Sequence, residues 1–248
     1  MNMSLLQCGA QLLRKAQRIV ALTGAGISRP SGIPDFRSDS GIWAHQNPLE
    51  VASLHAFRRD PHRFYGWLQG LLVPILTAVP NPAHRALADL EQRGKMRAVI
   101  TQNIDGLHQA AGSRRVFELH GHLRTATCHT CGVQAPAAPL MSIVRRGQAP
   151  RCRCGGAFKP DVVLFDETLP QGLVWLAQKE LEECDLLLIA GTSLEVAPVC
   201  HLPQIALRRG ARLLMINYDE TYLDQRADVL LHEDVAVALP AMMEQIES

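Results

Sequence analysis

The chain has 248 residues, of which 47% are hydrophobic and 20% charged. These values predict a soluble globular protein with one large domain, or one domain with a small insert. Lysine and arginine number 25 against 24 acidic residues, a formal net charge of +1, so bulk charge does not favour a nucleic-acid-binding protein. We find no secretory signal and no apolar run long enough to span a bilayer, and we expect a cytoplasmic location.

The predicted elements alternate between helices and strands along the chain. Residues 4–17 have the spacing of an amphipathic helix, and residues 18–22 follow as a strand. Further helices are expected at residues 83–91, after an Asn-Pro start signal, and at residues 171–184. Short apolar runs predict buried parallel strands at residues 98–100, 162–165, 186–189, 213–216 and 229–231. This alternation predicts a doubly wound α/β fold with a parallel, Rossmann-like sheet.

Two stretches interrupt the alternation. Residues 36–80 are rich in histidine, proline and aromatic residues, and we expect helices and loops outside the sheet. Residues 121–160 carry four of the seven cysteines and read as a small metal-binding insert. The sheet domain is then assembled from residues 1–35, 81–120 and 161–248.

The four clustered cysteines form two close pairs. Cys128-x-x-Cys131 is followed, after 20 residues, by Cys152-x-Cys154. Clustered cysteines in a reducing compartment indicate metal binding rather than disulfides. Four thiolates would close a tetrahedral zinc site and leave no position for a catalytic water, so we expect one structural Zn²⁺.

A small-residue turn follows the first predicted strand. Gly24-x-Gly26 indicates backbone amides that approach a pyrophosphate, although alone the motif is weak. The third glycine of the usual dinucleotide fingerprint would fall at position 29, which is arginine, and prolines prevent a long helix over residues 28–40. The expected loop could fold over a ligand or be an ordinary surface loop. It contains an acid, an aromatic and a cation in succession, namely Asp35, Phe36 and Arg37.

Polar residues follow three of the predicted strands, at residues 101–108, at residues 191–193 and at Asn217. Side chains just past the carboxyl end of a parallel strand face the ligand crevice of such a sheet. Hydroxyl and amide groups there suit ribose hydroxyls and phosphate oxygens. His120 is one of ten histidines, and composition alone does not distinguish it from a structural histidine.

Taken together, these motifs resemble the sirtuin family over nearly the whole chain, from Arg18 to Leu239. The matching segments are GAGISRPSGIPDFRS at residues 24–38, TQNIDGLH at 101–108, LHG at 119–121, the four cysteines, KPDVVLFDE at 159–167 and GTSLEVAP at 191–198. The resemblance implies an NAD-dependent enzyme that removes acyl groups, acetyl above all, from lysines of proteins or peptides. NAD would be consumed, with release of nicotinamide and O-acyl-ADP-ribose, and neither nucleic acid nor a membrane would be required.

The resemblance also implies which residues contact NAD, bound between the sheet and the zinc insert. Residues expected at the pyrophosphate and the adenosine half are Gly24, Ala25, Gly26, Gly191, Thr192, Ser193, Asn217 and Val235. Residues expected around nicotinamide and its ribose are Asp35, Gln102, Asn103, Ile104 and Asp105. Phe36 would shield the reactive face after nicotinamide leaves, and Arg37 would help to order the loop.

The mechanism implied by the resemblance begins when the acyl oxygen of the substrate lysine attacks C1′ of the ribose as nicotinamide leaves. His120 would then act as the general base on a ribose hydroxyl, which attacks the acyl carbon. Asn103 and Asp105 would position the ribose and a water. The peptide would pair by strand addition with residues 163–166 and 194–196, and the predicted substrate contacts are Val163, Phe165 and Tyr65.

Two positions depart from the family pattern. Asp166 stands where the family usually has glycine, which leaves the peptide preference near it open. Relatives that favour succinyl- or malonyl-lysine carry a Tyr-x-x-Arg pair, whereas Tyr65 is followed by Leu68 at that spacing. Without the bidentate cation an acidic acyl group loses its partner, so we predict a preference for neutral acyl groups.

Three rival interpretations remain at this point. An NAD-dependent dehydrogenase would need a fuller glycine fingerprint, and would generate absorbance at 340 nm. A zinc-ribbon binding module would leave Asn103, Asp105 and His120 unexplained, and would show salt-sensitive binding to DNA. A family member could also act mainly as a mono-ADP-ribosyl transferase. The natural substrate, the preferred acyl length and the oligomeric state stay open.

Overall fold

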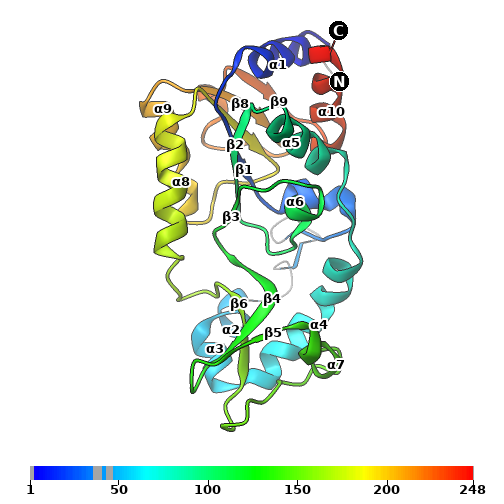
Figure 1. The fold of residues 1–248 in the computed structure, drawn as a ribbon, viewed down its shortest axis with the longest axis vertical. Helices are drawn as coiled ribbons and strands as arrows, with labels where there is room; N and C mark the ends of the chain where they lie inside the picture. Colours follow the sequence, from blue (N-terminus) through cyan, green and yellow to red (C-terminus); the bar gives the residue numbers. More distant parts are fainter. Residues whose placement is uncertain (1–2, 36–40, 43–46, 248) are drawn as a thin grey trace.

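The computed structural model describes residues 3–35, 41–42 and 47–247 (Figure 1). Its larger lobe contains a six-stranded parallel sheet in the order β3-β2-β1-β7-β8-β9. The strands are β1 (Ile19–Thr23), β2 (Met96–Thr101), β3 (Val116–Glu118), β7 (Leu186–Ala190), β8 (Arg212–Ile216) and β9 (Val229–Leu231). The strand order reverses between β1 and β7, as in a doubly wound fold, and the predicted fold class is confirmed.

Helices cover both faces of this sheet (Figure 1). One face packs against α1 (Met3–Lys15), α5 (Pro82–Gln92) and α10 (Val235–Glu247), and the other against α8 (Gln171–Glu183) and α9 (Pro203–Arg208). Every residue of β1 and of β7 is therefore buried. A sheet covered on both faces requires continuous apolar strands. This is why the sequence predicts these two strands correctly.

The predicted start signal of α5 is also observed. The side chain of Asn81 accepts hydrogen bonds from the backbone N–H groups of Ala83 and His84, and Pro82 occupies the first helical position. The ring of His84 accepts from the backbone N–H of Asn81 in return, which closes a capping box. The side chain of Asn81 also donates to the carbonyl of Ile27 at 2.7 Å, so the cap links the start of α5 to the segment that follows β1.

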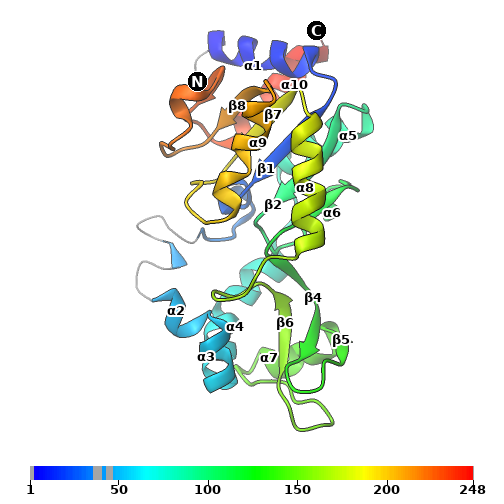
Figure 2. The ribbon, with the colours of Figure 1, turned by 90° about the vertical axis from the view of Figure 1, so that its left-hand side faces the viewer.

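The smaller lobe lies at the other end of the molecule (Figure 2). It combines an antiparallel sheet in the order β5-β4-β6 with four short or medium helices. These elements are α2 (Pro48–Val51), α3 (Leu54–Arg59), α4 (Pro61–Thr77), β4 (Gly121–Cys128), β5 (Gln134–Pro136), α7 (Met141–Val144) and β6 (Phe158–Val162). One apolar cluster unites them, because Phe57, Phe64 and Leu72 pack with Val144 and Val162. The two stretches that we predicted as separate inserts thus share a single core.

One sequence prediction about strands is wrong, and one strand of the main sheet was not predicted. The apolar run at residues 162–165 does not form a parallel strand of the main sheet; the strand there is β6, which ends at Val162 and pairs antiparallel with β4. A short apolar run identifies burial but not its partner strand. We also missed β3, whose parallel pairing with β2 places Glu118 beside Thr101; Glu118 is buried and forms an ion pair with Arg124.

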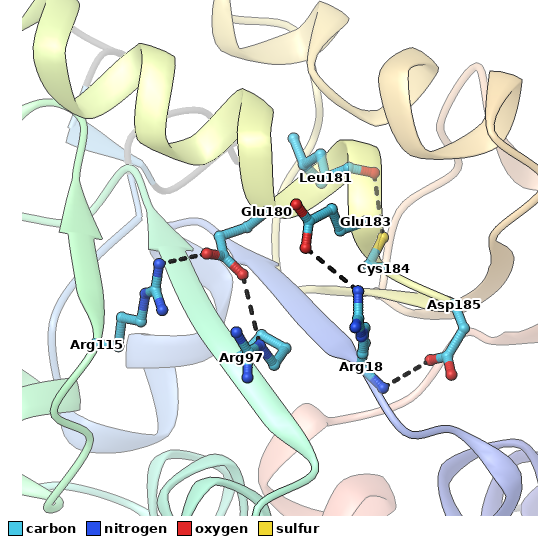
Figure 3. A network of polar contacts seen from close by, with 8 residues as sticks. All are labelled: Arg18, Arg97, Arg115, Glu180, Leu181, Glu183, Cys184 and Asp185. Carbon is cyan, nitrogen blue, oxygen red and sulfur yellow. Dashed lines mark hydrogen bonds and ion pairs between the residues drawn. The ribbon is translucent and has the colours of Figure 1, made fainter.

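The amino ends of the main strands are joined by charged groups (Figure 3). Glu180 of α8 is only 9% exposed and forms ion pairs with Arg97 at the start of β2 and with Arg115 just before β3. Asp185 accepts hydrogen bonds from the backbone N–H groups of Gln17 and Arg18, at 2.8 and 2.9 Å. These contacts tie α8 and its following turn to the strands.

Short helices complete the described part of the chain. They are η1 (Ala25–Ser31), α6 (Leu107–Ala110), η3 (Ala138–Leu140), η4 (Val199–His201) and η5 (Asp224–Arg226). Within the residues described above, no helix is both long and apolar enough to cross a membrane.

Candidate active site

Two glycine turns meet at the carboxyl ends of β1 and β7, where the strand order reverses. The N–H of Gly26 donates to the carbonyl of Gly191 at 2.9 Å. A Cβ on Gly26 would lie 2.8 Å from the Cα of Gly191, and one on Gly24 would lie 2.7 Å from the Cβ of Thr192. Gly191 has a φ of 63° and its Cβ would collide with the N–H of Ile27. Only glycine permits this approach, and it leaves backbone groups at the position where doubly wound folds bind their ligands.

The polar segment after β2 closes the same crevice. The side-chain amide of Asn103 donates to the carbonyl of Gly24 at 2.9 Å and to Oγ of Ser28 at 3.1 Å. Gln102 donates through Nε2 to the hydroxyl of Thr192 at 2.8 Å. Both N–H groups of the Asn103 amide are therefore used within the protein, and its Oδ1 is the atom that remains for a ligand hydroxyl.

Asp105 and Asn103 both contact the hydroxyl of Ser28. The carboxylate of Asp105 accepts from Oγ of Ser28 at 2.7 Å and from the N–H of Leu107 at 2.9 Å. Burial raises the pKa of Asp105, against the opposing effect of these two donors. A carboxyl group whose pKa is shifted by burial at such a crevice is a candidate functional residue.

Ser28 joins these groups, and we did not single it out from the sequence. Its hydroxyl contacts Asn103, Asp105 and, at 3.5 Å, Nε2 of His84. Ser28 is fully buried in η1. The available signal was its position directly after the glycine turn, but the partners come from α5 and from the segment after β2, which spacing does not reveal.

A second histidine, His108, packs against His84, the histidine that contacts Ser28. The centroids of the two rings lie 4.9 Å apart, and Nε2 of His108 lies 2.9 Å from Oγ1 of Thr23. Burial, followed by the neighbouring His84, lowers the pKa of His108 to about 3. Burial, followed by Arg85, lowers that of His84 to about 4. Both rings are therefore neutral at physiological pH.

His120 follows β3 at the end of the crevice that faces the smaller lobe. Its Nδ1 lies 3.1 Å from the carbonyl oxygen of Gln102. Because a carbonyl only accepts, Nδ1 carries the proton and Nε2 is the unprotonated acceptor. Burial lowers the pKa of His120, although the Gln102 carbonyl partly opposes this. The backbone carbonyl of His120 accepts from the N–H of Val163 at 2.8 Å, which fixes the position of the residue.

Three further predicted NAD contacts follow strands β7 and β8 or begin helix α10. Asn217 is buried after β8 and donates through Nδ2 to the carbonyl of Asp219 at 2.8 Å. Ser193 is half-buried after Gly191, and Val235 begins α10. Beside them, Arg29, Pro30, Tyr218 and Asp234 line a pocket of about 410 Å³.

The loop after η1 is described only in part. Asp35 forms an ion pair with Arg29 at 3.3 Å and is 15% exposed. Ile104 is half-buried and packs against the apolar cluster of the smaller lobe, so it stands between the two lobes. Phe36 and Arg37 lie outside the described residues, and their predicted roles stay predictions.

The four cysteines predicted to bind zinc converge. Their sulfur atoms all lie within 4.8 Å of one another, with Sγ of Cys128 3.5 Å from that of Cys154 and Sγ of Cys131 3.7 Å from that of Cys152. A tetrahedral zinc with Zn–S bonds of about 2.3 Å implies S···S edges of about 3.8 Å. Backbone N–H groups, that of Cys131 first, lower the pKa of the Cys128 thiol to about 6. The pKa of the Cys131 thiol is lowered by the backbone N–H of Val133 but raised more by the neighbouring thiols, to about 12, so the support for zinc comes from the arrangement of the sulfur atoms. The cysteine set therefore fits one structural zinc ion.

The predicted substrate residues are placed in two different environments. Val163 and Phe165 lie on the extended segment after β6, where Phe165 bridges to Ser53. Tyr65, in contrast, is 2% exposed, and its hydroxyl donates to the carbonyl of Phe158 at 2.7 Å. The hydroxyl of Tyr65 is thus engaged inside the core of the smaller lobe, and this placement does not agree with a direct substrate contact.

The fold and the crevice together define a dinucleotide-binding enzyme of the doubly wound class with a four-cysteine zinc insert. The chain matches the model of the Sir2 family over residues 24–198. It is 44% identical over 238 residues to a protein of Pyrobaculum aerophilum named NAD-dependent protein deacetylase 1, covering 96% of this chain and 93% of that protein. The chain belongs to the Sir2 family, as its motifs predicted.

Solved structures agree with this assignment. A structure described as the structural basis for the mechanism and regulation of Sir2 enzymes superposes with a TM-score of 0.94 at 41% identity, covering 99% of both chains. A Sir2 protein solved with a deacetylated p53 peptide and 3′-O-acetyl-ADP-ribose superposes with a TM-score of 0.92 at 37% identity, covering 99% of this chain and 98% of the other.

Proposed function

We propose that the protein is an NAD-dependent protein-lysine deacylase whose general base is His120. The observation that carries the assignment is the orientation of its ring: Nδ1 is engaged by the Gln102 carbonyl, and Nε2 has no partner among the described residues. A histidine held in one tautomer, with a pKa below its ordinary value of 6.5, is in its basic form at neutral pH. It is therefore ready to accept a proton from a ribose hydroxyl.

The glycine turns and their neighbours would hold NAD as a consumed substrate. Gly24, Ala25 and Gly26 are suited to the pyrophosphate because the turn exposes backbone without side chains. Residues suited to the adenosine half are Gly191, Thr192, Ser193, Asn217 and Val235. Residues suited to nicotinamide and its ribose are Asp35, Gln102, Asn103, Ile104 and Asp105.

Asn103 and Asp105 would position the ribose and a water. The free Oδ1 of Asn103 accepts from a ribose hydroxyl, and Ser28 holds both side chains in register through its single hydroxyl. The acyl oxygen of the lysine would bond to C1′ of the ribose as the bond to nicotinamide breaks. A ribose hydroxyl would then add to the acyl carbon, and loss of the lysine amine with addition of one water would give O-acyl-ADP-ribose. The protein supplies orientation, proton removal at Nε2 of His120 and protection from bulk water.

The acyl-lysine peptide would bind beside the segment 163–166. The link between the N–H of Val163 and the carbonyl of His120 places this extended segment directly next to the base. A peptide that pairs with it by strand addition directs a lysine side chain towards Nε2. Because Leu68 is buried in the core and supplies no cation, we expect neutral acyl groups to be preferred over succinyl. Desuccinylation that exceeds deacetylation would contradict this preference.

The experiment is to incubate the protein with NAD and an acetyl-lysine peptide and to identify the products by mass spectrometry. We expect peptide-dependent release of nicotinamide together with O-acetyl-ADP-ribose and the free-lysine peptide. Nicotinamide release with an ADP-ribosylated protein as the product would instead indicate ADP-ribosyl transfer. No release with any acyl peptide would contradict the proposed activity.

A further inference from the structure

Three carboxylates lie on or beside the segment that leaves β6 next to His120, and only one of them is available to a ligand. Asp161 accepts from Thr125, Thr127 and Gln134. Glu167 accepts from Lys159 at 2.9 Å and from the N–H of Leu164 at 2.8 Å. Asp166 is exposed and forms neither a hydrogen bond nor an ion pair with any other described residue.

The backbone of Asp166 is in a conformation that favours glycine. Its φ is 69°, and among the described non-glycine residues only Leu194 shares a positive value, at 56°. A left-handed conformation is unfavourable for a residue with a Cβ, although aspartate tolerates it better than most. An exposed acidic side chain at such a position has no packing role that would compensate for this conformation, and that suggests a function in recognition.

Asp166 lies close to His120 because it is only three residues further along the chain than Val163, whose N–H is bonded to the carbonyl of His120. Three residues span at most about 11 Å of extended chain. Val163 also packs against the apolar cluster of the larger lobe, which anchors the start of this segment.

We propose that Asp166 is a specificity-determining residue that selects acyl-lysine substrates with a lysine or arginine close to the modified residue. This inference rests on the proposed deacylase function and narrows its substrate class to basic segments. A cation on the peptide flank forms an ion pair with the exposed carboxylate, whereas an acidic flank is repelled. Because the pair is exposed, the preference is modest and weakens with added salt.

The test compares kcat/KM for three acetyl-lysine peptides that differ only in having lysine, serine or glutamate on both sides of the modified residue. In the native protein we expect the lysine peptide to exceed the serine peptide by about 1.5- to 5-fold, the range of one exposed ion pair, and the glutamate peptide to be poorest. Asp166→Asn is the matched variant, because asparagine keeps the size and the tolerance of positive φ but lacks the charge. It should abolish the preference, so that the lysine, serine and glutamate peptides have similar kcat/KM.

Asp166→Gly is the backbone control, since it removes the side chain and relaxes the conformation. It should resemble Asp166→Asn in peptide preference. Equal kcat/KM for the lysine and glutamate peptides in the native protein, or a preference that persists in Asp166→Asn, would overturn the inference. If no peptide is turned over, the proposed function falls; calorimetric affinities of the same peptides for the native protein and Asp166→Asn then decide the inference by the same criterion.

Discussion

The two ends of the main sheet are built from opposite kinds of polar group. At the amino ends of the strands, charged groups pair with one another, as Glu180 does with Arg97 and Arg115 (Figure 3). At the carboxyl ends, neutral amides, hydroxyls and imidazoles predominate, as in the contacts of Asn103 and Ser28. The two ends leave different atoms for a ligand.

The difference lies in which acceptors remain. At the amino ends, the carboxylate of Asp185 is engaged by two backbone N–H groups. At the carboxyl ends, Oδ1 of Asn103 and Nε2 of His120 have no partner among the described residues. Charged pairs within the chain contribute to stability, whereas unengaged neutral acceptors held by a rigid frame are suited to bind and deprotonate a ligand. The comparison predicts that substitutions at the two ends affect different properties.

The largest effect is expected from His120→Ala. Loss of the general base should lower kcat/KM for an acetyl-lysine peptide by about 10²- to 10⁴-fold, while the free energy of unfolding changes by about 1 kcal/mol or less. Steady-state kinetics and urea denaturation measure the two quantities. The matched control is His201→Ala at an exposed histidine of the larger lobe, which should alter neither.

Acidification should destabilise the carboxyl end through His84 and His108. Their folded-state pKa values of about 4 and about 3 lie below the ordinary 6.5, so the unfolded chain binds more protons below pH 6.5. Their contribution to stability is complete above that pH and is lost as the pH falls. Each histidine should cost about 2 kcal/mol between pH 7 and pH 5. Denaturation curves across this range should show the loss, and a His108→Gln variant should show a smaller slope.

Gly191→Ala tests whether the crevice depends on close backbone approach. The new Cβ would collide with the N–H of Ile27 and would force a side chain into positive φ. We expect a loss of about 3 kcal/mol in the free energy of unfolding together with weaker NAD binding. Gly210→Ala is the comparison, because Gly210 also has a positive φ, 87°, but its Cβ would meet no atom within 4 Å. If both variants lose the same free energy of unfolding, the effect at Gly191 comes from the positive φ and not from close backbone approach.

The smallest effect is expected at the amino end. Glu180→Gln keeps the size of the side chain but removes the charge that Arg97 and Arg115 contact, and should reduce the free energy of unfolding by about 1–2 kcal/mol. Kinetic constants should be unchanged. A fall in kcat/KM comparable with that of a crevice substitution would break the proposed division of the sheet.

The sequence predicted those parts of the fold in which burial is uniform along an element. Strands β1, β7 and β9 are short apolar runs flanked by polar residues, and each was placed within one residue of its observed bounds. Strand β3 was missed because it has three residues, one of them the buried Glu118. Its burial depends on an ion pair with Arg124, which no local pattern shows.

The candidate site was predictable where strand ends determine position. Asn103 and Asp105 could be placed because polar residues after a parallel strand face the crevice. Ser28 could not, since its role depends on contacts with residues 56 to 77 positions away in the sequence. Tyr65 was misplaced because a helical motif does not show which face of the helix packs inward, and here the tyrosine hydroxyl reaches the carbonyl of Phe158.

The most direct test of the division between the two ends is a paired measurement on His120→Ala and Glu180→Gln. Steady-state formation of O-acetyl-ADP-ribose and the free energy of unfolding are measured on the same preparations of both variants and of the native protein. We predict that His120→Ala loses formation of this product but keeps its stability, and that Glu180→Gln loses stability but keeps formation of the product. Undiminished formation of O-acetyl-ADP-ribose in His120→Ala would contradict the account.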